Sequence, residues 1–190
     1  RHMPNYQIDK IFIILLILEK CSSWVMTKHP DDFFQQLQNL CLDAGVKVFY
    51  TPKLPKVPIS GSTRWIKDAP IIQLTARYKQ NDRFWFTFFH EAGHILLHGK
   101  KYISLENINF SEADPEKEQE ANDFAEACTL TKEQENEVFN ALPINESDII
   151  IFAEKFKTHP AIIIGRLQHK QLIPYNTGHE FIEPIDLSNS

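Results

Sequence analysis

Apolar side chains recur at every third or fourth position along five stretches of the chain, and they alternate with polar side chains along three shorter stretches, while a sixth helical stretch is short and polar. The first spacing places apolar residues on one face of a helix, and the second places them on one face of a strand. The predicted helices span residues 30–44, 83–98, 114–128, 131–142, 147–157 and 160–170, and the predicted strands span residues 46–50, 64–66 and 71–75. The pattern predicts a mostly helical α+β fold with a small three-stranded sheet.

Residues that favour helix ends lie at these boundaries. Gly45 follows the first predicted helix at the position where glycine commonly ends one. Asp114 and Pro115 supply an N-cap and a first-turn proline for the third helix. Thr131 and Gln134 have the spacing of a capping box at the start of the fourth. The last two helices each have an apolar face and are expected to form a C-terminal helix pair.

The chain is expected to divide into four parts: a cloning remnant and lead-in segment (1–28), a main domain (29–142), the helix pair (143–178) and a loose tail (179–190). The apolar run Ile11–Leu18 is too short to cross a bilayer, which requires roughly 20 residues. No small-residue cleavage site follows that run. We therefore expect a cytoplasmic protein without membrane contact.

Composition narrows the possible functions. The 190 residues carry a formal net charge of −5, which disfavours a strongly basic nucleic-acid-binding chain. The 3 cysteines are widely spaced and form no CxxC pair, which favours reduced thiols over a disulfide framework. What remains is a reduced, globular domain with a substantial core.

The candidate chemistry lies on the predicted central helix, where residues 90–94 read His-Glu-Ala-Gly-His. This H-E-x-x-H motif places His90 and His94 on one helical face, where both imidazoles can bind one metal ion. Glu91 projects about 100° away, beside the ion, in the position of a general base. The alternative, two core histidines around a buried glutamate, is disfavoured because an unpaired buried carboxylate is costly.

A catalytic zinc ion needs a third protein ligand. His98 lies about 6 Å farther along the same helix and cannot complete a tetrahedron, so we assign it to the polar end of the helix. Glu118 is the preferred ligand because it borders the buried face of the next predicted helix, and Asn122 on that face is expected to hold a ligand histidine. Glu120, the other candidate, is expected to be a solvated acid.

The sequence resembles the ImmA/IrrE family of metallopeptidases, which combine H-E-x-x-H with E-x-E-A-N-x-F-A. Residues 118–125 match the second element as Glu-Gln-Glu-Ala-Asn-Asp-Phe-Ala, and the resemblance covers roughly residues 30–175. It implies a gluzincin-like zincin fold, a zinc site of His90, His94 and Glu118, and Glu91 as the base. Segments such as Phe84–Thr87 are similar to the branch found in antitoxin-type transcriptional regulators. In that branch a DNA-binding domain usually precedes the peptidase-like domain.

The leading hypothesis is a zinc-dependent metallo-endopeptidase, with Mn²⁺ as the alternative ion, acting on a repressor, a co-encoded regulator or a toxin. DNA contact is expected only through a domain outside this sequence. The alternatives are a metal-stabilised regulatory or sensor domain without catalysis and a metal-free helical scaffold. Strand 71–75 is either an internal strand or the edge that pairs with an extended substrate. Four side chains are candidate oxyanion donors: Tyr78, Tyr102, His159 and His169.

Overall fold

The structure is a computed structural model that describes residues 32–51, 59–75, 77, 80–101, 104–105, 114–185 and 187. Its α-helices are α2 (Phe33–Asp43), α3 (Asn81–Gly93), α4 (Pro115–Thr129), α5 (Lys132–Asn140), α6 (Glu146–Phe156) and α7 (Pro160–His169). A π-helix, η1 (His94–His98), continues α3, and η2 (Gly99–Lys101) and η3 (His179–Phe181) are 3₁₀ turns. The strands are β1 (Lys47–Thr51), β2 (Gly61–Ile66), β3 (Ala69–Thr75) and β4 (Ser104–Leu105). The α+β prediction is confirmed.

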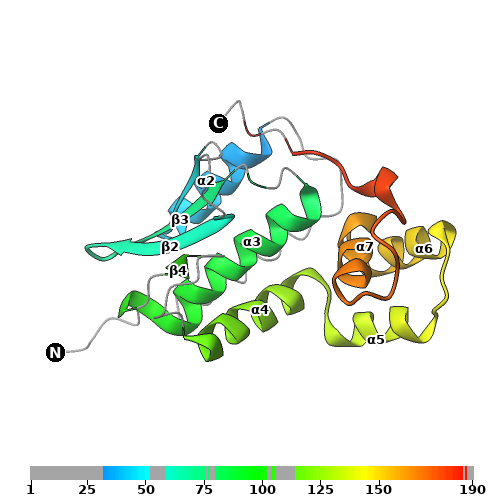
Figure 1. Cartoon of the computed structure of the whole chain (residues 1–190). Coiled ribbons are helices and arrows are strands. Elements are labelled where there is room, and N and C mark those ends of the chain that lie inside the picture. The colour runs from blue at the N-terminus through cyan, green and yellow to red at the C-terminus, as the bar shows by residue number, and fades with distance from the viewer. Residues whose placement is uncertain are drawn as a thin grey trace.

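Helix α3 crosses the middle of the molecule, with the sheet on one side and α4 on the other (Figure 1). Helices α5 to α7 form a separate group beyond the N-terminal end of α3, and α7 packs against it. The ends of α4 and α5 follow the sequence prediction, since Asp114 caps α4 and Thr131 forms a capping box with Gln134. Because α3 contacts the sheet, α4 and α7, its exposed polar positions are few.

The sheet has the order β1-β3-β2-β4, so a fourth strand of 2 residues joins the three that were predicted. Strand β3 pairs in parallel with β1 and antiparallel with β2. Both of its edges are therefore occupied, and the hypothesis that residues 71–75 pair with a substrate is wrong. An extended peptide finds no free edge on an internal strand.

Aromatic side chains join α2 to α3 and fix the orientation of α3. The Phe33 and Phe84 ring centroids are 5.7 Å apart at an interplanar angle of 79°. The Trp85 and Phe88 rings lie edge to face, with centroids 6.0 Å apart. Both Trp85 and Phe88 are fully buried. Burial of this face of α3 turns the opposite face, which carries Phe86 and His90, toward α4.

The C-terminal segment packs against the domain, which corrects the expectation of a loose tail. The amide of Asn81 donates to the carbonyl of Glu183, and Gln80 pairs with Pro184 in an isolated bridge. Ile185 and Leu187 are buried members of the core. The apolar run 11–18 lies outside the described residues, and among the described helices none is long and apolar enough to span a membrane.

Candidate metal centre

His90, near the C-terminal end of α3, and His94, the first residue of η1, project from the same helical face. Their Nε2 atoms are 3.0 Å apart, and their residues are 2% and 0% exposed, respectively. The four-residue spacing accounts for the approach, because it returns a side chain to the same face of a helix. Glycine at position 93 lets α4 come close, since a Cβ there would lie 3.2 Å from the Phe124 ring.

Glu118 reaches the two histidines from α4. Its carboxylate oxygens lie 3.5 Å from the Nε2 atom of His90 and 3.5 Å from that of His94. Together the three residues form a group whose ligand atoms all lie within 4.8 Å of one another. The structure thus brings together the three residues that the sequence predicted as metal ligands, and it places Glu120 elsewhere.

This triangle of residues has the donor set of a zinc site. Bonds of about 2.05 Å from zinc to its ligands give ligand–ligand edges of about 3.3 Å, close to the 3.0 Å between the two Nε2 atoms, and each Glu118 oxygen approaches a different histidine. Burial, followed by the neighbouring His90, lowers the pKa of His94 to about 3. His94 is therefore neutral at pH 7, which is the form of imidazole that binds metals. The two nitrogens and one carboxylate suit zinc.

Hydrogen bonds from the far side of each ring orient the two histidines. The Asn122 Oδ1 atom lies 2.9 Å from the Nδ1 atom of His90, which must donate because the amide oxygen accepts. The lone pair of His90 is then on Nε2, facing Glu118 and His94. Asn122 therefore occupies the position that the sequence predicted for it.

His94 is oriented by a chain of hydrogen bonds that the sequence analysis did not predict. Its Nδ1 atom is 2.9 Å from the Nδ1 atom of His98, whose Nε2 atom is 2.9 Å from a carboxylate oxygen of Glu120. Because the carboxylate accepts, the Nε2–H group of His98 donates to Glu120, which leaves the Nδ1 atom of His98 to accept from the Nδ1–H group of His94. His94 also keeps its lone pair on Nε2. Two lone pairs 3.0 Å apart repel each other, and a cation between them removes that repulsion.

His98 lies at the polar end of the helix and Glu120 is an exposed acid, both as expected. The structure adds the contacts of His98 with His94 and with Glu120, which the sequence did not predict. The backbone gives the reason: residues 94–98 form a π-helix, which changes the angle between successive side chains. Single π-helical turns are frequent at functional sites.

His98→Ala is expected to lower zinc affinity about 10- to 100-fold, the usual effect of removing a residue that orients a ligand. Competition with a chromophoric chelator measures the affinity. Glu120→Ala is expected to have a smaller effect that is not additive with His98→Ala, since the two side chains act as one chain. Exposed His179→Ala serves as the control, and equal zinc affinities in His98→Ala and His179→Ala would contradict the assignment.

Glu91 lies next to the histidines and is fully buried. The hydroxyl of Thr63 on β2 donates to its Oε2 atom over 2.6 Å. Gly61 on the same strand makes room for the carboxylate, because a Cβ at that position would lie 2.7 Å from Oε1. Strand β2 therefore fixes the direction of the predicted base.

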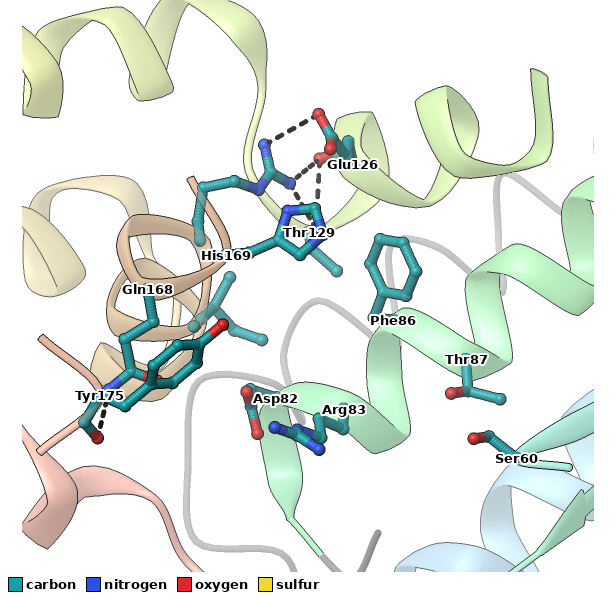
Figure 2. A pocket seen from close by; sticks show the side chains of 13 residues that line it. Ser60, Asp82, Arg83, Phe86, Thr87, Glu126, Thr129, Gln168, His169 and Tyr175 are labelled. Carbon is teal, nitrogen blue, oxygen red and sulfur yellow. Dashed lines mark hydrogen bonds and ion pairs between the residues drawn. The ribbon is translucent and has the colours of Figure 1, made fainter. Parts of the chain in front are cut away.

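A cavity of about 240 Å³ begins one helical turn from His90, between α3, α4 and α7. Figure 2 shows Asp82 and Phe86 from α3, Glu126 and Thr129 from α4, and His169 from α7 around it. The ring of Phe86 also stacks against that of His90, with centroids 6.3 Å apart and an interplanar angle of 27°. The cavity and the metal centre thus share one wall.

The structure describes two of the four candidate oxyanion donors and places them differently. Tyr78 and Tyr102 lie outside the described residues. His159 accepts a hydrogen bond from the Ala161 amide at the start of α7 and contacts Asn81, about 13 Å along α3 from His90. His159 is therefore a helix cap, and His169 lines the cavity.

The profile of the peptidase M78 family, described as the IrrE N-terminal-like domain, matches residues 41–167. The match covers more than half of the chain and includes all three residues of the triangle. The chain belongs to this family. The resemblance inferred from the two motifs is thereby confirmed, and the M78 domain is of the metallopeptidase type with a possible metal site at His90, His94 and Glu118. A comparison with curated proteins finds no match.

Proposed function

We propose that this M78 domain is a zinc-dependent metallo-endopeptidase that hydrolyses a peptide bond of a protein substrate. The observation that carries the proposal is Glu91, a fully buried carboxylate that follows candidate ligand His90 in the chain and is held in one orientation by the Thr63 hydroxyl. A metal site that served only as a structural staple would not require a buried carboxylate next to it. His90, His94 and Glu118 would hold the ion, and Mn²⁺ is the alternative to Zn²⁺.

When bound, the ion supplies Lewis acidity, which lowers the pKa of water and polarises the scissile carbonyl. Glu91 accepts the proton of the attacking water and later delivers it to the leaving amine. The Thr63 hydroxyl keeps Glu91 in one orientation through both transfers. The peptide would lie beside the cavity between α3, α4 and α7 and not along β3, because β3 is an internal strand with no edge for strand addition.

The resemblance to antitoxin-type regulators supports a repressor, a co-encoded regulator or a toxin as the substrate, in the cytoplasm. The second candidate is a regulatory or sensor domain in which the metal stabilises the fold without catalysis. The position of the candidate ligands supports the sensor function as well as the peptidase function, because a metal ion held by His90 and Glu118 would join α3 to α4 whether or not a reaction occurs. DNA contact would again require a further domain.

Removal of the metal separates these functions. Treatment with a chelator and dialysis is expected to abolish cleavage of a denatured protein mixture, and one equivalent of Zn²⁺ is expected to restore it. Mass spectrometry of new peptide N-termini measures the cleavage. Metal-dependent thermal stabilisation without any new N-termini would support the sensor function and contradict the peptidase.

A further inference from the structure

The cavity beside the metal centre is large enough for a substrate side chain. A cavity of about 150 Å³ in a protein core accommodates benzene, and this one measures about 240 Å³. It lies one helical turn from the candidate metal centre on both helices, because Phe86 precedes His90 by one turn of α3 and Glu126 follows Asn122 by one turn of α4. A peptide held at the metal would pass its opening.

The lining of the cavity includes apolar residues from two helices. The Phe86 ring lies on one side, and Ile162 and Gly165 of α7 lie on the other. Gly165 leaves room for Asp82, because a Cβ at position 165 would lie 2.7 Å from the Oδ2 atom of Asp82. The helix pair therefore supplies one wall and packs directly against the first turn of α3.

Most of the charged groups around the cavity already have partners. Arg166 donates to Glu135 over 3.0 Å and lies 3.5 Å from a carboxylate oxygen of Glu126, which also accepts from Lys170. Asp82 differs, because its buried Oδ1 atom has no hydrogen-bond partner among the residues that the structure describes. Burial raises the pKa of Asp82 against the opposing effect of Arg83. A buried acceptor without a donor is destabilising, and a ligand that brings a donor removes that cost.

We propose that this cavity is a substrate subsite for a long side chain with an apolar body and a hydrogen-bond donor at its end, as in Arg, Lys or Tyr. The body would pack between Phe86 and Ile162 while the donor reaches the Asp82 carboxylate after a small rotation of that group. The subsite begins one turn, about 5.4 Å, from His90, and a strand advances about 3.3 Å per residue. The side chain would therefore belong to a residue within about two positions of the cut bond.

This inference rests on the proposed peptidase function, and a peptide library tests both. A proteome digested after Glu retains internal Arg, Lys and Tyr, and it is incubated with the zinc-loaded protein and with Glu91→Gln as the background. Glu91-dependent cuts are expected to show Arg, Lys or Tyr enriched at one fixed position near the cut. The relative enrichment of Arg, Lys and Tyr shows whether the donor is cationic or neutral. The positive charge of nearby Arg83 would favour the neutral donor, Tyr.

Variants of the cavity then test the role of Asp82. Asp82→Ala is expected to lower the ratio of kcat/KM for the preferred peptide over its Leu-substituted form by about 10-fold or more, the effect of losing one charged hydrogen bond. Gly165→Ala is expected to act in the same direction by crowding Asp82. The matched control is Asp43→Ala at the exposed end of α2, for which the ratio is expected to stay unchanged. Cleavage without a positional preference would overturn the subsite and leave the peptidase function in place.

A binding measurement tests the subsite without catalysis. Zinc-loaded Glu91→Gln protein is titrated with the Nα-acetyl methylamides of arginine, lysine, tyrosine and leucine while amide NMR shifts are recorded. We expect shifts at Asp82, Phe86 and Gly165 with at least one of the first three and not with leucine, and their loss in Asp82→Ala. Equal shifts with leucine, or none with any probe, would overturn the subsite even if cleavage is found. Binding without any cleavage would keep the subsite and contradict the peptidase.

Discussion

Glu91→Gln is expected to reduce peptidase activity about 10²- to 10⁴-fold while the protein keeps its metal and its melting temperature. The amide has the shape of the carboxylate, and the Thr63 hydroxyl can still donate to its oxygen. It cannot accept the proton of the attacking water, so the rate falls. The side chains of His90, His94 and Glu118 are untouched, so bound zinc, measured by elemental analysis, is expected to remain stoichiometric.

Two further variants test the origin of that loss. Glu154→Gln makes the same chemical change at an exposed position on α6 and is expected to leave activity unaltered. Gly61→Ala keeps the carboxylate but places a methyl group against it, and it is expected to lower activity without removing the metal. If Glu91→Gln cleaves at the wild-type rate, Glu91 is not the base and the proposed mechanism is wrong.

The sequence predicted the candidate ligands because their arrangement is local. His90 and His94 share a face of one helix, and Glu118 and Asn122 share a face of another, so each pair follows from the helical period alone. Apposition of the two faces then required only that both helices bury their apolar sides. The choice of Glu118 over Glu120 came from the same reasoning, and Glu118 lies nearer to both histidines in the structure.

The features that the sequence did not predict depend on departures from local regularity or on distant contacts. The position of His98 follows from the π-helical turn, whereas the prediction assumed a regular α-helix. The Thr63–Glu91 contact joins residues 28 positions apart. The cavity exists only because α7 packs on the start of α3, some 80 residues earlier in the chain. No periodicity along one segment carries such information.

Arg166→Ala is expected to lower the free energy of unfolding by about 3–5 kcal/mol, a large part of the 5–15 kcal/mol typical of a domain. Arg166 is 8% exposed and donates to fully buried Glu135 over 3.0 Å and to the carbonyl oxygen of Glu126 over 2.9 Å. Its loss removes one of the two side-chain donors of buried Glu135, the other being Lys132, and takes a donor from the Glu126 carbonyl. Urea unfolding at pH 7 measures the change. The control is Lys155→Ala, which removes an exposed pair with Glu137 and is expected to cost under about 1 kcal/mol.

The same network predicts how stability changes with pH. Burial acts to raise the pKa of Glu135, but the hydrogen bonds from Lys132 and Arg166 outweigh it and hold the pKa below its ordinary value of 4.5. A carboxyl whose pKa is lower in the folded state stabilises the fold above the unfolded pKa, and that contribution is lost as the pH falls through the folded pKa. The wild-type protein is therefore expected to lose stability below pH 4.5. Arg166→Ala is expected to lose less over that range, because the pKa of Glu135 is lowered less when one of its hydrogen bonds is missing. Equal acid losses in the two proteins would show that Arg166 does not set the charge state of Glu135.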